Sequence, residues 1–207
     1  MSHRLNSAAL VGFALLLAAC AAGTSFVSTW ANPNLPAIEK AKGQTVIACV
    51  VAKDKYIRHD AEDTLAAELT KRGSIGVPSY TLLPPGVEDE ALAKAAFEKS
   101  GAVGVVVMRP VAVDEQTSVT TASMYAGPYY GGYWGGYYGY GWGAPYASSY
   151  VTTDTIIVVE TLVYSLKHNQ LVWSGRSRTT NPSQVASFVK DLVAAAAWEM
   201  NKAGVFK

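Results

Sequence analysis

Strand-like and helix-like segments alternate through the middle of this chain, and their order restricts the folds that it can adopt. Residues 45–52 and 103–108 are continuous apolar runs rich in valine, which is typical of strands buried on both faces. Residues 79–83 predict a shorter strand between them, closed by a Pro-Pro-Gly turn. Residues 57–72 and 88–100 predict two helices, each followed by a glycine that can end it. This alternating order predicts parallel strands joined by right-handed crossovers.

The last part of the chain predicts an antiparallel hairpin and a third helix. Residues 155–166 and 170–180 are long strand-like segments, and Asn169 between them can take the left-handed conformation that a tight turn needs. The third helix is predicted to begin at Pro182, with Asn181 as its capping residue. Its apolar residues form one stripe, which indicates that this helix packs on the core.

These segments together predict a single mixed α/β domain over residues 43–207. We expect one mixed sheet of five strands, three parallel and two antiparallel, with three helices. Numbered along the chain, the strands are expected in the spatial order 2-1-3-4-5. The fifth strand is then a solvated edge, because Arg176 and Arg178 follow Ser174 on one of its faces.

The amino-terminal segment resembles the leader of a bacterial lipoprotein. His3 and Arg4 precede an uncharged apolar run over residues 8–19, which is shorter than the roughly 20 residues that span a bilayer as a helix. The run closes with Leu17-Ala18-Ala19-Cys20, a pattern that resembles the lipobox. The resemblance implies that residues 1–19 are a signal peptide and that Cys20 is lipid-modified and becomes the mature N-terminus.

The same resemblance implies a place at the outer membrane. Ala21 follows the lipid-bearing cysteine, and in enterobacterial sorting this favours the outer membrane over the inner. Residues 20–42 are expected to form an extended tether, and Trp30 is expected to pack on the domain where the tether ends. The protein is therefore expected to be lipid-anchored and to face the periplasm.

The composition of the mature chain restricts its partners. Removing 19 leader residues from 207 leaves 188, enough for one domain with a sizeable core, with acidic and basic side chains in equal number. A neutral chain lacks the basic surface that nucleic acid requires. Cys49 has no second cysteine to pair with once Cys20 is acylated, so no disulfide is expected, and its apolar neighbours predict a buried thiol.

A tyrosine- and glycine-rich segment over residues 125–150 separates two of the predicted strands, so we expect it at the tip of a long hairpin. No charged side chain occurs from Gln116 to Thr153. One interpretation is a low-complexity loop without a specific ligand. The other is a contact surface for lipid, peptidoglycan or another envelope protein, because tyrosine and tryptophan combine an apolar ring with a polar tip. Its contact residues would be Tyr133, Trp134, Tyr137, Tyr138 and Trp142.

Motifs of catalysis are missing from the sequence. There is no Gly-x-Ser-x-Gly elbow, phosphate loop or Cys-x-x-Cys pair. His59 and Asp63 would be i, i+4 neighbours on a helix, but with Asp60 and Glu62 they predict a solvated first turn rather than a metal site. No metal or cofactor is expected. The remaining acids on or near strands form no evident acid–base pair: Glu115, Asp154 and Glu160.

Several segments resemble a class of small, uncharacterised bacterial lipoproteins. They are Arg58-His59-Asp60-Ala61-Glu62-Asp63 in the first predicted helix, and Val105-Val106-Val107-Met108-Arg109 and Leu171-Val172-Trp173-Ser174-Gly175 in strands. The layout is also similar to the amino-terminal domain of the Tol-system protein TolB and to envelope lipoproteins of the curli-secretion type. These resemblances imply a fold and no assigned activity.

Two classes of function remain open at this point. The first is a non-enzymatic, membrane-anchored envelope lipoprotein that binds a partner or supports envelope integrity. The second is a hydrolase-like periplasmic enzyme with an unrecognised site. The scarcity of histidine and the lack of a nucleophile motif favour the first class.

Overall fold

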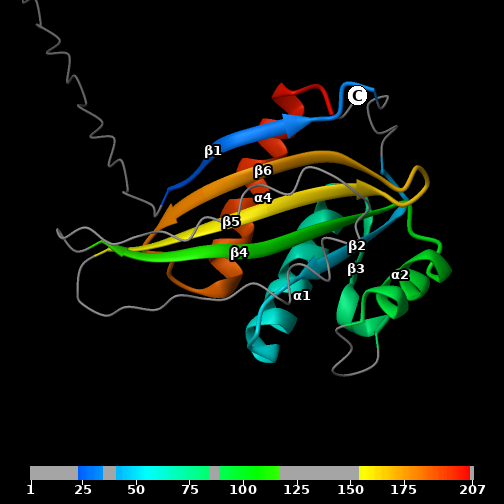
Figure 1. Cartoon of the computed structure of the whole chain (residues 1–207), viewed down its shortest axis with the longest axis horizontal. Helices are drawn as coiled ribbons and strands as arrows, with labels where there is room; N and C mark the ends of the chain where they lie inside the picture. The colour runs from blue at the N-terminus through cyan, green and yellow to red at the C-terminus, as the bar shows by residue number, and fades with distance from the viewer. Residues whose placement is uncertain (1–22, 35–40, 84–88, 117–153, 206–207) are drawn as a thin grey trace, which may run out of the picture.

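The sheet at the centre of the molecule has six strands in the order β1-β6-β5-β4-β2-β3 (Figure 1). A computed structural model describes residues 23–34, 41–83, 89–116 and 154–205. The expected mixed α/β class and three helices are confirmed in these residues, but the five-stranded sheet and its order were wrong. The elements are β1 (Thr24–Ala31), β2 (Thr45–Val50), α1 (Lys55–Lys71), β3 (Ile75–Pro78), the 3-10 turn η1 (Ser79–Thr81), α2 (Glu90–Lys99), β4 (Gly104–Gln116), β5 (Asp154–Ser165), β6 (Gln170–Thr180) and α4 (Val185–Lys202).

The parallel part of the sheet is built around β2, which pairs in parallel with both β3 and β4. This pairing was predicted, but the short strand β3 lies before residues 79–83 rather than at them. Pro78 explains the difference, because proline has no N–H to donate and the chain turns into η1 directly after it. Gly76 lets α1 approach this edge closely, since a Cβ at this position would collide with the backbone of Ala66.

The antiparallel part of the sheet is a long ribbon of β4, β5 and β6. β4 continues beyond Pro110, with a register shift between Pro110 and Ala112 that accommodates the proline. The turn between β5 and β6 contains Asn169 at φ 49°, which confirms the predicted left-handed residue.

The strand that the sequence analysis missed is β1, which lies within the predicted tether. It pairs antiparallel with β6, so β6 is an inner strand and the predicted solvated edge was wrong. Phe26 of β1 packs edge-to-face on Trp173 with 5.5 Å between ring centroids. Trp30 packs on the domain as expected, but from within this strand.

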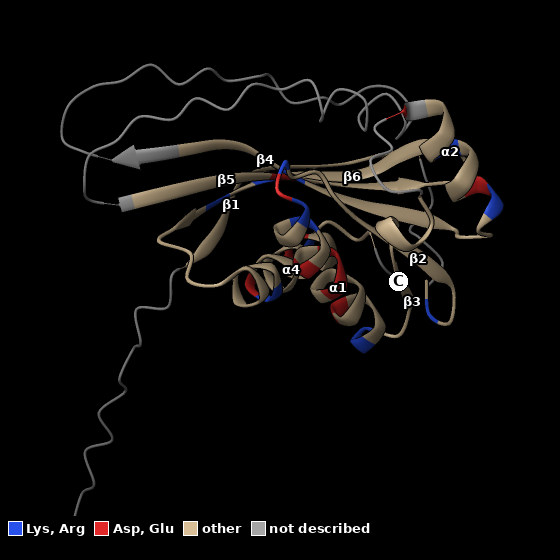
Figure 2. Cartoon of the chain, turned by 90° about the horizontal axis from the view of Figure 1, so that it is seen from below, with Lys and Arg blue, Asp and Glu red and all other residues tan. Residues whose placement is uncertain are grey.

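The helices divide between the two faces of the sheet (Figure 2). α1 and α4 cover one face, where Trp173, Leu65 and Leu192 lie in the larger core cluster. α2 covers part of the other face, where Phe97 packs in a second cluster with Cys49. Burial of Cys49 confirms the predicted internal thiol, and it has no disulfide partner among the described residues.

The third helix begins at Val185, later than predicted. Asn181 does not cap it: this residue has φ 48°, and its side-chain oxygen accepts a hydrogen bond from the Thr155 N–H at 2.8 Å. The Asn181 side chain thereby ties the end of β6 to the start of β5. The actual cap is Gln184, which makes no side-chain capping bond.

Candidate functional site

The carboxyl end of β2 leads into α1, and the cap at the start of this helix sets which of its side chains face the sheet. Asp54 is the N-cap, and its carboxylate accepts hydrogen bonds from the N–H groups of Tyr56 at 2.8 Å and Ile57 at 3.1 Å. The helix then presents Ala61 and Leu65 to the core. Glu62 lies on the same buried side of α1.

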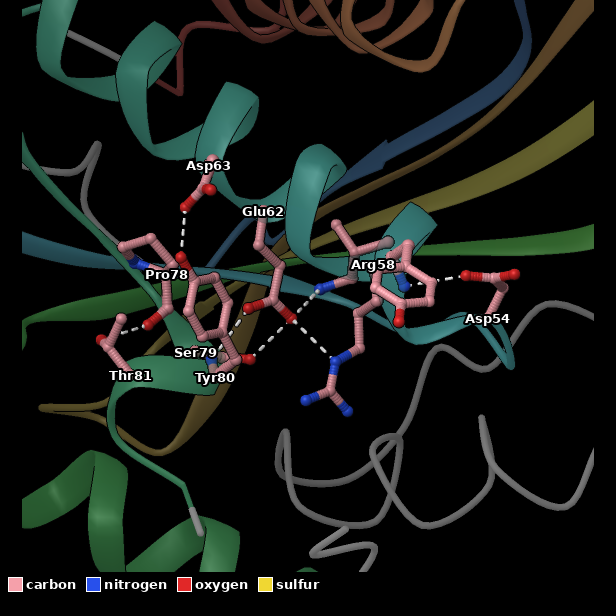
Figure 3. A network of polar contacts seen from close by, with 10 residues as sticks. Asp54, Arg58, Glu62, Asp63, Pro78, Ser79, Tyr80 and Thr81 are labelled. Atoms are coloured by element: carbon pink, nitrogen blue, oxygen red, sulfur yellow. Dashed lines mark hydrogen bonds and ion pairs between the residues drawn. The ribbon is translucent and has the colours of Figure 1, made fainter. Parts of the chain in front are cut away.

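The Glu62 carboxylate joins three separate elements of the fold. Its Oε1 accepts hydrogen bonds from the Val50 N–H at 3.1 Å and the Ser79 hydroxyl at 2.7 Å. Its Oε2 accepts one from the Tyr80 N–H at 2.9 Å. Figure 3 shows these groups converging on Glu62, with the Arg58 Nε 3.9 Å from Oε1. The side chain thus ties α1 to the end of β2 and to η1.

Burial dominates the electrostatics of this network. It raises the pKa of Glu62, against the opposing effects of the three hydrogen bonds and of the Arg58 charge. Burial also raises the pKa of the neighbouring Cys49 thiol, and the Glu62 charge adds to this increase. Cys49 is therefore a protonated thiol at neutral pH and lacks the thiolate that a nucleophile requires.

The prediction of a solvated acidic first turn was wrong in two respects: α1 begins at Lys55, so its first turn contains no acidic residue, and Glu62 is not solvated. Asp60 and Asp63 are exposed, whereas Glu62 is completely buried. The signal was present in the sequence: Glu62 precedes Leu65 by three positions and Ala66 by four, and both belong to the apolar stripe of the helix. A carboxylate within such a stripe requires buried donors.

An aromatic pair lies at the outer rim of the network. The rings of His59 and Tyr80 stack with 4.1 Å between centroids. The Tyr80 hydroxyl donates to Asp63 Oδ1 at 2.7 Å, and this bond raises the pKa of the Tyr80 phenol. Asp63 thus accepts a hydrogen bond from Tyr80, whose ring stacks on His59. Within the described ranges no group of three or more His, Cys, Asp or Glu side chains could hold a metal ion.

A second buried cluster of charges crosses the antiparallel ribbon. Arg109, Glu160 and Arg176 are direct neighbours on β4, β5 and β6. The Glu160 carboxylate lies 3.2 Å from Arg109 Nη2 and 3.6 Å from Arg176 Nη2. In the sequence Glu160 has no evident partner, because the two arginines become its neighbours only once the strand register is known. The side chains of Glu115 and Asp154 are not among those described.

The first described strand and the β4–β5 pair have their ends at the same end of the sheet. β1 begins at Thr24, four positions after Cys20. Thr24 pairs with Thr179, which in turn pairs with Ile157 of β5. β4 ends and β5 begins slightly beyond this level, where Gln116 pairs with Asp154 (Figure 1).

The predicted site residues themselves lie outside the described residues. This applies to the lipid attachment residue and to the five proposed contact residues: Cys20, Tyr133, Trp134, Tyr137, Tyr138 and Trp142. Among the helices of the described ranges, none has the length and apolar character needed to cross a bilayer.

Comparison with known proteins gives similarity in fold only. No family model and no curated protein matches the chain. A solved structure of a PelC dodecamer from Paraburkholderia phytofirmans is 15% identical with a TM-score of 0.42, and the match covers 81% of this chain and 89% of that one. Lipoprotein GNA1162 from Neisseria meningitidis is 13% identical with a TM-score of 0.37, covering 77% and 99%. At these values the similarities carry no conclusion about function, and the resemblance to TolB and curli-secretion lipoproteins stays a prediction.

Proposed function

We propose that this chain is a non-enzymatic lipoprotein of the bacterial envelope, held at the outer membrane by acylated Cys20 and facing the periplasm. The observation that carries the proposal is the position of β1. Thr24 is four positions after Cys20, and a chain of this length spans at most about 14 Å. Because β1 is hydrogen-bonded into the sheet, lipid on Cys20 would hold the folded domain directly beside the bilayer.

The buried polar groups support a structural rather than a catalytic role. The Glu62 carboxylate accepts three hydrogen bonds from the protein itself. Ser79, the hydroxyl closest to this carboxylate, is 2% exposed, so a substrate does not reach it. The neighbouring thiol of Cys49 is held protonated by burial. A hydrolase would need an accessible nucleophile beside a base, and these groups do not supply one.

The aromatic segment is proposed as the contact surface of the protein, through Tyr133, Trp134, Tyr137, Tyr138 and Trp142. Two arguments support this proposal: the segment is uncharged and aromatic, and its flanking strands end at the anchored end of the sheet. Its partner would be lipid, peptidoglycan or another envelope protein. Nucleic acid is not proposed, because the net charge of the chain is only +1 and the aromatic residues are not interleaved with basic ones.

The proposal is tested by removing the lipid attachment residue. We expect Cys20→Ala to abolish acylation, so that the protein stays unprocessed or appears in the soluble periplasmic fraction. Cys49→Ala is the matched control, because it removes the other cysteine and should leave the protein acylated and membrane-bound. Membrane fractionation and metabolic labelling with a fatty acid measure both outcomes. A Cys20→Ala protein that is still labelled and pelleted would overturn the proposal.

A further inference from the structure

We propose that the end of the sheet where β1 begins and the β4–β5 pair terminates faces the lipid headgroups, so that the long strands stand on the bilayer rather than lie along it. This inference rests on the proposed acylation of Cys20. It goes further by assigning which described surface meets the lipid, and it names the bilayer itself as the partner of that surface.

Strand register places the relevant groups at one level of the sheet. Thr24 pairs with Thr179, Thr179 with Ile157, and Ile157 with Val113 of β4. Figure 1 shows these strand ends together at the left of the ribbon. Beyond Val113, β4 continues for three residues, or about 10 Å. The β4–β5 pair therefore projects ahead of the start of β1.

The short connection to Cys20 fits this projection. It spans at most about 14 Å, which exceeds the projection of about 10 Å. The end of the β4–β5 pair can therefore touch the headgroups while the lipid on Cys20 is inserted and β1 stays paired. At the opposite end, the turn after Ser165 lies eight or more residues along β5 from Ile157, or about 27 Å farther away. When the strands stand on the bilayer, only the end of the sheet that contains Thr24 reaches the headgroups, and the turn after Ser165 does not.

The exposed side chains near this end suit a lipid interface. Ser25 of β1 is exposed, and Val113 of β4 is 40% exposed. Arg178 on β6 is also exposed, and its guanidinium can pair with a lipid phosphate. β1 itself contains no charged residue. The Arg178 charge limits the depth, because a charged side chain enters the hydrocarbon core at a high cost, so this end should rest at the headgroup level.

The orientation is tested with the acylated full-length protein in vesicles of phosphatidylethanolamine and phosphatidylglycerol. Single fluorophores are attached to new cysteines in a Cys49→Ala background, and the quencher is a lipid with a nitroxide on its headgroup. We expect fluorophores at Ser25→Cys and Val113→Cys to lose most of their emission. Fluorophores at Asn34→Cys and Lys167→Cys should keep theirs. Asn34 is the matched control, because it is exposed and follows the far end of the same strand, β1.

The possible outcomes separate this inference from the anchor itself. Quenching at Asn34 equal to that at Ser25 would show that the sheet lies along the bilayer. Quenching at Lys167 alone would show the reverse orientation, and quenching at no position would show a domain held off the surface. Each of these results overturns the inference while vesicle flotation still supports the anchor. Failure of the protein to float with vesicles would instead refute the proposed function.

Discussion

The network around Glu62 gives the sharpest prediction about stability. In Glu62→Gln, one carboxylate oxygen becomes an NH2 group. If this group replaces Oε2, it faces the Tyr80 N–H; if it replaces Oε1, it faces the Val50 N–H. Either way, a buried donor loses its acceptor. In the second orientation the Ser79 hydroxyl can rotate to accept a hydrogen bond from the new NH2 group, so each orientation leaves one buried N–H without an acceptor.

The magnitude follows from the groups left without partners. An orphaned buried donor costs about 1–3 kcal/mol, and the removal of a desolvated charge recovers part of this, so we expect Glu62→Gln to lower the free energy of unfolding by about 2 kcal/mol. Glu62→Ala leaves three donors without an acceptor and should cost roughly 4 kcal/mol. For a domain of this size these losses correspond to drops in Tm of roughly 4–8 °C and 8–16 °C.

Urea-induced unfolding followed by circular dichroism measures these differences, and Asp60→Asn is the matched control. Asp60 is exposed on the same helix, so the same change of charge should alter the free energy of unfolding by less than about 0.5 kcal/mol. A Glu62→Gln protein as stable as Asp60→Asn would refute the assigned role of the network.

The pH dependence of the same pair of proteins tests the electrostatic argument. Because burial raises the pKa of Glu62 above its ordinary value of 4.5, the folded state binds this proton more tightly than the unfolded state. Protonation of Glu62 therefore contributes to the free energy of unfolding. This contribution is complete below the pKa of Glu62 in the unfolded state and is lost as the pH rises through its pKa in the folded state. The stability difference between the wild type and Glu62→Gln should therefore narrow as the pH rises above 4.5. A difference that widens would mean that hydrogen bonds to the carboxylate outweigh its burial.

Three further predictions concern separate parts of the chain. The Cys49 thiol should react slowly with a maleimide in the native state and rapidly in urea, and fast native labelling would contradict its burial. Gly76→Ala should lower the free energy of unfolding by about 2 kcal/mol or more, measured by urea titration, because a Cβ collides with the α1 backbone; an unchanged midpoint would contradict the close approach. Replacement of residues 127–145 by a short Gly/Ser turn should leave Tm near that of the parent but weaken co-sedimentation with vesicles or peptidoglycan. A large drop in Tm would place the aromatic residues in the core.

The elements that the sequence predicted well are those whose pattern is local. The buried strand β2 and the helix α1 each show a period or an apolar run that identifies the element without its neighbours. The hairpin turn at Asn169 was likewise predictable, because a left-handed residue is a local requirement.

The elements that were missed depend on partners distant in the chain. β1 forms because Phe26 packs on Trp173, which is remote in sequence, so the segment alone looked like a tether. The pairing of Glu160 with Arg109 and Arg176 requires the register of three strands. Glu62 was the exception, since its place within the apolar stripe of α1 was visible and could have predicted burial.

The assignment of β1 also changes the functional interpretation. A tether over residues 20–42 would allow the domain to move far from the membrane. With β1 paired to β6 from Thr24 onward, the free connection is reduced to a few residues. A lipid on Cys20 would then hold one end of the sheet at the surface, which is the premise of both proposals.

Intact mass spectrometry of the wild-type protein from the membrane fraction tests the central claim most directly. We predict a chain that begins at Cys20, lacks residues 1–19, and carries the added mass of acyl chains. A mature chain without acyl mass, or an intact leader on the protein recovered from the membrane, would contradict the account.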